Sequence, residues 1–289
     1  MKSPPDLHVP REWHEAAQRL ERDNIRTVGV IGRTDSGKSM LTGFLFTSAI
    51  QTGRDVALID TDLGQKMIGP PACVTMSDAQ GLALAFVGST DPVLGWKPLL
   101  EGTQRLFSRT DATIKIINTS GLLSGPGRRL KAAKLQVIQP DLLIVLGNAP
   151  DLEPIIGERP DIPVLHLPSS PHARRKTDGE RRAGRRQAFH RYFEDAAVLS
   201  LDPALLLETP PAISPDRRLL VGLRNGLGND LGLGLLGGAG DNEAIEVLTP
   251  VRQAAIQGIV PGMLALDEAY SETRLKAEGR GWPGARSLL

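Results

Sequence analysis

The sequence predicts an α/β fold in which helices flank a mostly parallel sheet, with a small β-rich module at the C-terminal end. Two observations predict it. Over roughly the first 170 residues, short apolar runs alternate with stretches long enough to form a helix, which is the pattern of parallel βαβ units. After a proline-rich stretch at residues 203–215, short strand-like pieces follow one another between glycines.

Each expected element has its own signal. Residues 11–22 have helical spacing with their apolar side chains on one side, and residues 38–51 form a second expected helix that ends before Gly53. The expected strands of the core are residues 25–31, 55–59, 82–87, 113–117, 141–146 and 163–167. Those of the C-terminal module are residues 219–223, 230–236 and 243–248.

The expected elements divide the chain into four parts. These are a lead-in with an N-terminal helix at 1–24, a core domain at 25–205, the β-rich module at 206–275 and a frayed tail at 276–289. Glycine and leucine alternate over residues 226–238, which is typical either of a flexible tract or of a strand whose neighbours come very close. We favour the closely packed strand.

Composition excludes several classes of protein. The chain has 289 residues, of which 40% are hydrophobic and 23% charged, as in a soluble globular protein. Its single cysteine, Cys73, excludes an internal disulfide framework and a cysteine-rich zinc site. The N-terminal residues lack the pattern of a secretory signal, and no apolar run is long enough to span a membrane. We therefore expect a cytoplasmic protein without a membrane partner.

The clearest motif is a phosphate-binding loop at residues 32–39, which matches G-x-x-x-x-G-K-[ST]. It follows an expected strand and begins an expected helix, and this context disfavours a chance glycine-rich turn. Backbone N–H groups and the helix N-terminus would face phosphate oxygens, Lys38 would reach the β- and γ-phosphates, and Ser39 would bind Mg²⁺. The motif predicts a P-loop NTPase core. The residues expected to bind the nucleotide are Gly32, Thr34, Asp35, Ser36, Gly37, Lys38, Ser39 and Met40.

A pair of carboxylates follows the second expected strand. Asp60 and Asp62 lie at the carboxyl end of that strand, so we expect them to face the same crevice as the phosphate loop. One would hold Mg²⁺ through water and the other would accept a proton from an attacking hydroxyl; the alternative is a solvated turn. Residues 147–151 lack the lysine of a guanine-reading Asn-Lys-x-Asp motif. ATP is the expected nucleotide, although this does not exclude GTP as a donor.

Residues 172–191 form a strongly cationic stretch. They include eight arginines and lysines and only two acidic residues, although the whole chain has a net charge of +1. Arginine suits forked contacts with phosphate, so we expect a mobile lid over a nucleotide or a nucleic-acid contact in preference to a solvated helix face. Residues 119–121 follow another strand, where an ordinary turn is the alternative to a place in the crevice. Trp96 is interpreted equally well as a platform for a base or as a partly buried anchor.

Together these segments resemble the polynucleotide 5′-hydroxyl kinase family. The resemblance extends from about residue 10 to 270 and is strongest in GRTDSGKS at 32–39, DTDLGQ at 60–65, FVGSTDP at 86–92, NTSGLLSGPG at 118–127 and the arginine-rich stretch at 170–193. Residues 247–250 and 258–262 resemble the family's C-terminal β module. The resemblance implies Mg²⁺-dependent transfer of the γ-phosphate of ATP to the 5′-hydroxyl end of RNA or DNA.

The resemblance also implies roles for individual residues. Asp62 corresponds to the family's general base, and Asp60 to its companion near the metal. The catalytic residues that it implies are Lys38, Asp62 and the lid cations Lys176 and Arg181, with Arg175 and Arg182 one register away. Substrate contacts are expected from Gln65, Trp96, Thr119, Ser120 and Gly121, of which the last three form a "clasp" beside the γ-phosphate. Metal contacts are expected from Ser39, Asp60 and Asp62.

Two positions depart from the family pattern. Leu122 stands where the clasp usually has tryptophan, and Lys176 stands where the lid usually has arginine, whose forked contact lysine cannot make. These departures favour, as an alternative, an ATP-binding scaffold or switch of the same fold with weak or no transfer. A kinase or ATP-dependent synthetase for small molecules is disfavoured by the cationic stretch. The expected partner is RNA or DNA with a free 5′-hydroxyl, and no protein partner is predictable from the sequence.

Overall fold

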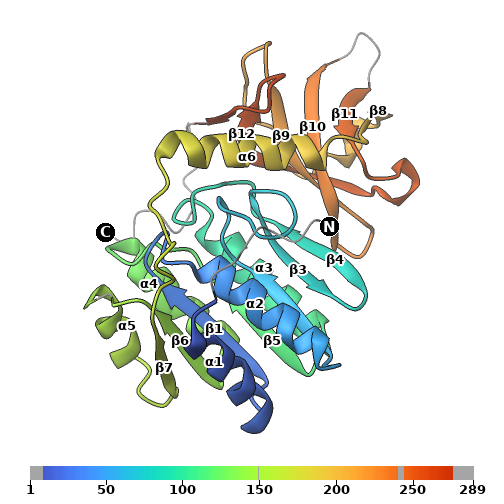
Figure 1. Ribbon diagram of the computed structural model, residues 1–289. Coiled ribbons are helices and arrows are strands. Elements are labelled where there is room, and N and C mark those ends of the chain that lie inside the picture. The colour runs from blue at the N-terminus through green and yellow to red at the C-terminus, as the bar shows by residue number, and fades with distance from the viewer. Residues whose placement is uncertain (1–8, 149, 240–243, 276–289) are drawn as a thin grey trace. The chain divides into compact units, whose positions relative to one another are not determined.

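The fold was analysed in a computed structural model that describes residues 9–148, 150–239 and 244–275. The chain divides into two compact units, Met1–Arg185 and Arg186–Leu289 (Figure 1). The expected frayed tail and most of the expected lead-in lie outside the described residues. The expected domain boundary near residue 205 stays a prediction.

The first unit is built on a seven-stranded sheet with the strand order β4-β3-β2-β5-β1-β6-β7 (Figure 1). The five strands β2, β5, β1, β6 and β7 are parallel, whereas β3 and β4 are antiparallel additions at one edge. This confirms the mostly parallel sheet. The strands are β1 (Thr27–Gly32), β2 (Val56–Asp60), β3 (Cys73–Asp78), β4 (Gly81–Phe86), β5 (Ile114–Asn118), β6 (Leu142–Leu146) and β7 (Val164–Leu167). Of these, only β3 had no counterpart among the expected strands.

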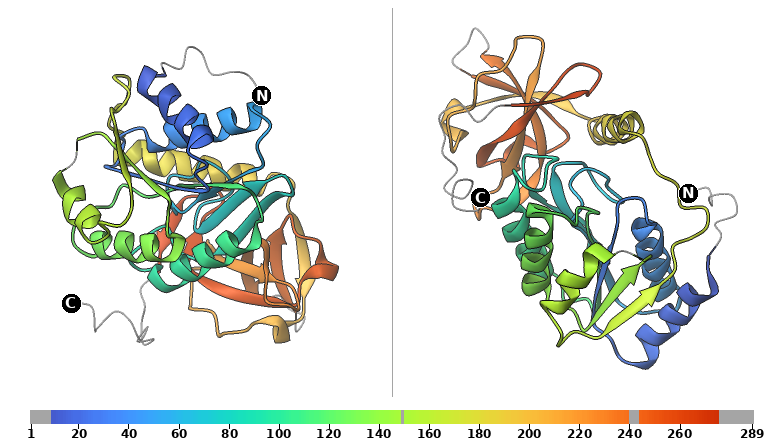
Figure 2. Two further views of the ribbon diagram at one scale, coloured as in Figure 1. Left: turned by 90° about the horizontal axis from the view of Figure 1, so that it is seen from below. Right: turned by 90° about the vertical axis from the view of Figure 1, so that its left-hand side faces the viewer.

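Helices cover both faces of this sheet (Figure 2). Successive strand residues point to opposite faces, so Val30 of β1 packs with α1 and α2, and its neighbour Ile31 packs with α3, α4 and α5. Strands buried on both faces read as continuous apolar runs, which explains why they were visible in the sequence. The helices are α1 (Arg11–Arg22), α2 (Lys38–Gln51), α3 (Trp96–Arg109), α4 (Pro126–Ile138) and α5 (Glu153–Gly157).

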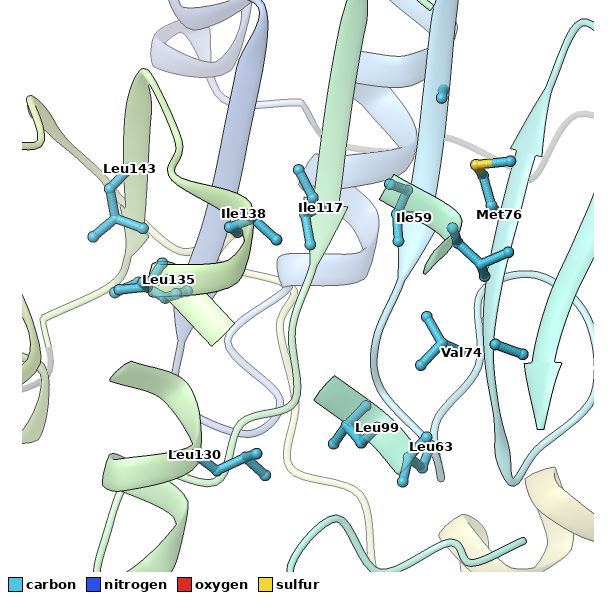
Figure 3. Packing of buried hydrophobic residues seen from close by; sticks show 14 of the residues in the cluster. Ile59, Leu63, Val74, Met76, Leu99, Ile117, Leu130, Leu135, Ile138 and Leu143 are labelled. Atoms are coloured by element: carbon cyan, nitrogen blue, oxygen red, sulfur yellow. The ribbon is translucent and has the colours of Figure 1, made fainter. Parts of the chain in front are cut away.

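The larger of the two hydrophobic layers holds α3 and α4 against the sheet. Ile59, Ile117 and Leu143, from three different strands, are buried in one cluster with Leu99 of α3 and Leu135 of α4 (Figure 3). Each fully buried side chain of this size contributes about 1.5–3 kcal/mol relative to an exposed one. The loops that connect these strands to these helices are therefore held at both ends by packed elements.

The second unit is an antiparallel sheet of six strands in the order β13-β12-β9-β10-β11-β8, which confirms the β-rich module. Gly234 of β10 shows how closely its strands pack, because a Cβ there would lie 2.5 Å from Val247 Cγ1. The glycine-leucine alternation thus belongs to a packed strand. The strands are β8 (Ala197–Leu201), β9 (Arg218–Arg224), β10 (Asp230–Ala239), β11 (Ile245–Thr249), β12 (Gly258–Leu266) and β13 (Glu272–Arg274).

Helix α6 (Asp178–Tyr192) begins in the first unit and ends in the second. It is the longest described helix, with 15 residues. Within the described ranges, no helix has both the length and the apolar character needed to cross a membrane. Short 3₁₀ turns at Pro150–Leu152, Pro203–Leu205 and Gln253–Ala255 complete the secondary structure.

Candidate functional site

The predicted functional segments meet at one edge of the seven-stranded sheet. Adjacent parallel strands β2, β5 and β1 end side by side, and a segment with polar residues follows each of them. We call these segments the acidic loop (residues 61–66, after β2), the clasp loop (residues 119–125, after β5) and the phosphate loop (residues 33–37, after β1). The crevice outside the carboxyl ends of parallel strands is where open α/β sheets bind ligands.

The phosphate loop has the backbone of an anion cradle. Asp35 and Gly37 have positive φ angles of 62° and 95°, and α2 begins immediately afterwards at Lys38. A Cβ on Gly32 would lie 2.7 Å from the backbone oxygen of Leu146, so glycine is required where β1 passes β6. The helix N-terminus and the curled backbone both favour a bound anion.

Two buried polar side chains of this region suit a phosphate ligand. Lys38 is buried, and its ammonium donates to the carbonyl of Arg33. Burial lowers the pKa of Lys38 to about 8, although the nearby carboxylates of Asp62 and Asp35 oppose the shift. Ser36 Oγ is buried and, within the described residues, has no hydrogen-bond partner. A phosphate oxygen would satisfy both groups.

The two carboxylates of the acidic region differ sharply in their surroundings. Asp60 is fully buried, and both of its oxygens are engaged, by Asn118 Nδ2 at 3.0 Å, by the backbone of Met67 at 2.7 Å and by Lys66 at 3.2 Å. Asp60 therefore holds the acidic loop in place, and its charge is already balanced. Its expected contact with a metal stays a prediction.

Asp62 is half-buried and interacts electrostatically with three lysines of the site. Its Oδ1 accepts backbone hydrogen bonds from Gly64 and Gln65 at 3.0 and 2.9 Å. Its negative charge raises the pKa values of Lys38, Lys131 and Lys134 against the effect of burial. Of the two aspartates, Asp62 is thus the one that is electrostatically coupled to the phosphate loop.

The clasp loop touches the phosphate loop directly. Thr119 Oγ1 donates to the carbonyl of Val30 in β1 at 2.8 Å. A Cβ on Gly121 would lie 2.3 Å from the backbone nitrogen of Thr34, so only glycine allows this approach. Leu122, at the family's tryptophan position, lies against Gly127 in the first turn of α4, where an added Cβ would be 2.3 Å from Leu122 Cγ.

The lid segment, defined here as residues 174–185, contacts the phosphate loop and the acidic loop within the first unit. The backbone N–H of Lys176 donates to Asp35 Oδ2 at 2.9 Å, and the guanidinium of Arg181 binds the same oxygen. The side chain of Gln65 donates to the carbonyl of Arg181 at 3.3 Å. Burial would raise the pKa of Asp35, but the Lys176 N–H and the Arg181 guanidinium outweigh it, so the pKa lies below its usual value. Arg175 and Arg182 are exposed.

This arrangement can be set beside known proteins. Residues 32–195 match the sequence model of the family described as "mRNA cleavage and polyadenylation factor CLP1 P-loop". The chain belongs to this family. The match covers the phosphate loop, the acidic loop, the clasp loop and the lid segment, which are the parts that converge in the first unit.

Two archaeal proteins are similar to this chain over most of its length. The polyribonucleotide 5′-hydroxyl-kinase of Pyrococcus horikoshii is 30% identical over 230 residues, which is 75% of this chain and 63% of the relative. That of Pyrococcus furiosus is 33% identical over 205 residues, covering 66% and 58% of the two chains. The matched region thus spans less than two thirds of the length of these relatives.

A solved structure shows the same fold. The Clp1p chain of a Clp1p–Pcf11p complex superposes with a TM-score of 0.71, covering 88% of this chain and 79% of that one, at 13% sequence identity. An identity this low supports the architecture alone. The superposition includes more of the chain than the family match does.

Two buried lysines of α4 were not among the sequence-predicted residues of the site. Lys131 and Lys134 are each 1% exposed, and they donate to the clasp loop and to the acidic loop respectively. Burial lowers the pKa of Lys134 to about 8 and that of Lys131 well below its usual value, an effect that neighbouring lysines strengthen. The available signal was their position between Leu130 and Leu135, inside the buried stripe of the helix.

Trp96, Gln65 and Met40 lie in less decisive surroundings. Trp96 is the first residue of α3 and packs, partly buried, against the core cluster, which fits the anchor interpretation. Gln65 joins the acidic loop to the lid segment. Met40 is 44% exposed in the first turn of α2. The substrate and nucleotide contacts expected of these three residues stay predictions.

The residues present fit a magnesium ion that is bound mainly through substrate. No group of three or more His, Cys, Asp or Glu side chains is close enough to hold a metal in the described parts of the chain. Mg²⁺ does not need one, because it commonly uses one or two protein oxygens and completes its shell with phosphate oxygens and water. Ser39 at the start of α2 and Asp62 in the acidic loop would supply such oxygens.

A cavity of about 560 Å³ lies where β6 and β7 end. Its lining includes Gly147, Asn148, His166 and Ser169. Because β6 pairs with β1, this cavity lies beside the strand that leads into the phosphate loop. Asp151, which a guanine-reading motif would need, instead forms an ion pair with Arg33. This pairing agrees with the weak case for guanine made from the sequence.

We expect Gly121→Ala to weaken nucleotide binding. The new methyl group would displace the clasp loop from Thr34, and overpacking of this kind costs about 1–3 kcal/mol, which is a loss of about 5- to 150-fold in affinity. Titration calorimetry with ADP measures the effect. Gly157→Ala is the matched control, because a Cβ there meets nothing within 4 Å. Equal affinities for the Gly121→Ala variant and the wild type would contradict the close contact.

We also expect Lys134 to make stability depend on pH. Its pKa is about 8 in the folded protein and near 10.5 when exposed, so the unfolded chain binds more protons between these values. Stability from this group is complete above about pH 10.5 and is lost as the pH falls through 8. Urea unfolding at pH 7.5, 8.5 and 9.5 should show a smaller rise in Lys134→Met than in wild type. The exposed Lys97→Met control should behave as wild type.

Proposed function

We propose that this chain is a polynucleotide 5′-hydroxyl kinase that transfers the γ-phosphate of ATP to the 5′-hydroxyl end of RNA or DNA. The observation that supports it most is the contact of one lid segment with both the phosphate loop and the acidic loop. A donor phosphate, an acceptor hydroxyl and a cationic cover are then brought to one place. The names of the archaeal relatives, polyribonucleotide 5′-hydroxyl-kinases, support the same chemistry.

The donor side of the reaction belongs to the phosphate loop. Its backbone N–H groups and the N-terminus of α2 face the β- and γ-phosphates, and the ammonium of Lys38 exchanges the carbonyl of Arg33 for a phosphate oxygen. The hydroxyl of Ser36 donates to another oxygen. Because these donors are already buried, little solvent has to be reorganised when the charge of the transition state develops.

The acceptor side belongs to Asp62 and the clasp loop. The oxygen of the 5′-hydroxyl attacks the γ-phosphorus, the bond from that phosphorus to the bridging oxygen breaks, and ADP leaves. Asp62 accepts the hydroxyl proton and later releases it to solvent. Two backbone hydrogen bonds to Asp62 Oδ1 fix its carboxylate, and Thr119, Ser120 and Gly121 hold the end of the polynucleotide beside it.

The lid supplies the remaining positive charge. Arg181 is held by Asp35 of the phosphate loop, so its guanidinium is beside the place where the transferred phosphoryl group lies. It moves from this carboxylate to the phosphoryl oxygens as the donor binds, and the closed lid excludes water as a competing acceptor. Ser39 and Asp62 would hold a magnesium ion, which would neutralise part of the charge of the donor phosphates.

Arginines on the outer side of the lid favour a polymeric acceptor. Arg175 and Arg182 are exposed, and a small acceptor molecule does not need cations at such exposed positions. Arginine side chains bind the phosphates of a polynucleotide without regard to its sequence. Transfer to RNA and to DNA is therefore proposed together, with RNA favoured by the names of the relatives.

The alternative is a nucleotide-binding scaffold. It is favoured by Leu122, whose side chain lies against Gly127 where the family has a ring, and by the exposure of Lys176. The Clp1p structure that resembles this chain was solved in a complex with Pcf11p. In this alternative, nucleotide binding would organise a protein interface, and phosphate would not be transferred.

Labelled ATP separates these functions. With γ-labelled ATP and Mg²⁺, we expect label on RNA or DNA oligonucleotides that have a 5′-hydroxyl end and none on oligonucleotides with a 5′-phosphate. Nucleotide binding without labelling would favour the scaffold. Labelling of small metabolites alone would mean a different acceptor.

Two substitutions test the donor and the base. Lys38→Ala should abolish transfer because the γ-phosphate loses its buried cation, whereas the exposed Lys97→Ala should retain it.

Asp62→Asn should retain ADP binding in calorimetry but lower transfer by about 10²–10⁴-fold, the usual contribution of a general base. Asp111→Asn, an exposed position, is the control for the second change. Near-normal transfer by Asp62→Asn would remove Asp62 from the mechanism.

A third comparison tests the register of the lid. Arg181→Gln should reduce kcat by at least tenfold, because its guanidinium is the one directed at the phosphate loop, and each tenfold loss is about 1.4 kcal/mol of transition-state stabilisation. Its neighbour Arg182→Gln removes the same charge from an exposed position and should change kcat much less. Steady-state labelling at saturating ATP measures both. A larger loss of kcat in Arg182→Gln than in Arg181→Gln would assign the catalytic role to Arg182 instead.

A further inference from the structure

Helix α4 places two lysines, one helical turn apart, underneath the loops of the site. Lys131 and Lys134 are buried among the apolar residues that pack α4 against the sheet. Long charged side chains are rarely buried completely, because an ammonium group loses its hydration. A helix that only packed on the sheet would not need them, so their hydrogen bonds call for an explanation.

The two lysines make the same contact with two different loops. Lys131 Nζ donates to Thr119 Oγ1 at 2.9 Å, and that hydroxyl donates in turn to the carbonyl of Val30 in β1. Lys134 Nζ donates to Thr61 Oγ1 at 3.1 Å, and that hydroxyl donates to the carbonyl of Asn118 in β5. Each lysine thus joins a loop threonine, through its hydroxyl, to the end of the neighbouring strand.

Each lysine also binds a backbone carbonyl of its loop. Lys131 donates to the carbonyl of Ser120 in the clasp loop, and Lys134 lies 3.5 Å from the carbonyl of Thr61 in the acidic loop. The carbonyls of irregular loops lack the partners that a helix or sheet would provide, and leaving one unpaired in the interior is costly. The two lysines of α4 therefore supply the hydrogen-bond donors that these loop carbonyls would otherwise lack.

We propose that Lys131 and Lys134 are positioning residues, each holding one half of the acceptor site. Lys131 fixes the clasp loop, which holds the end of the polynucleotide, and Lys134 fixes the acidic loop, which carries Asp62. Neither lysine was identified by sequence analysis. The kinetic part of this inference rests on the proposed kinase function, and its structural part does not.

Charge gives these lysines a second reason to be buried here. Asp62 is the carboxylate that acts on Lys38, Lys131 and Lys134 together. Asp35 adds to its effect at Lys38, and Asp60 at Lys134. Burial lowers the pKa values of all three lysines, and the charge of Asp62 opposes this shift without cancelling it. The excess of positive charge favours the approach of a polyphosphate.

The closing experiment compares two matched variants. Lys131→Met and Lys134→Met each keep the unbranched side chain up to the position of Cε, and each remove one buried amine from the same helix. Effects of the lost charge are common to both, so a difference between them reports on the loops. Arg129→Met, at an exposed position of α4, is the control that should leave every readout unchanged.

The kinetic readout is the division between KM and kcat. Lys131→Met should raise the KM for a 5′-hydroxyl oligonucleotide by about tenfold, the effect of losing about 1.4 kcal/mol, with kcat changed less than threefold. Lys134→Met should lower kcat by about tenfold with little change in that KM. The same effect on both constants in both variants would mean a general structural role and would overturn the proposal.

Hydrogen–deuterium exchange provides a readout that does not need activity. In nucleotide-free protein, Lys131→Met should speed exchange at residues 119–125, and Lys134→Met should speed it at residues 61–66. Unchanged exchange in both loops would overturn the proposal even if the wild type labels oligonucleotides. Loop-specific exchange in a wild type that does not label would support the positioning role and reject the kinase. If Lys131→Met does not fold, Lys131→Gln keeps a shorter donor and should show an intermediate change at residues 119–125.

Discussion

The parallel pairing of β2, β5 and β1 is the constraint on which the rest of the site depends. Because these strands are neighbours and run in the same direction, their carboxyl ends bring together three segments that are far apart in the sequence. The hydrophobic layers on both faces hold the strands in that register. The polar loops then need only short-range hydrogen bonds to reach one another. A change of register would separate Asp62 from Lys38 even if every loop kept its own conformation.

Within that frame, the site is organised by buried charge. Asp60 is neutralised by Lys66 and serves the architecture, whereas Asp62 remains coupled to several lysines. Burial alone would make this concentration of ammonium groups unfavourable, as the lowered pKa of Lys38 shows. Under the proposed function, a bound polyphosphate would supply negative charge to these ammonium groups, so part of the cost of burying them would be recovered on binding. The unfavourable free energy of burying these amines in the free protein would thus add to the affinity for an anion.

Asp35 links the phosphate loop to the lid by the same principle. Its carboxylate engages the Arg181 guanidinium and the Lys176 N–H, donors of the kind that bind a phosphoryl group. The loop thereby keeps the lid segment beside it before a donor binds. Gln65 joins the lid segment to the acidic loop as well, so the lid segment contacts both loops. This double contact is the reason that a kinase is favoured over a scaffold with the same phosphate loop.

The α/β class, the phosphate loop, the acidic pair and the strands buried on both faces could all be predicted from local sequence. Each of these has a pattern within a few residues: a continuous apolar run, a glycine spacing, or a carboxylate directly after a strand. Three features became visible in the folded chain alone: Asp60 is the aspartate paired with Lys66, Arg181 and not Arg182 binds Asp35, and Lys131 and Lys134 donate to the loops. β3 was also missed, because its sequence, CVTMSD, lacks a continuous apolar run. These features depend on hydrogen bonds and packing between segments that are far apart in the sequence. The spacing of residues within one segment does not show which distant residues will become its neighbours.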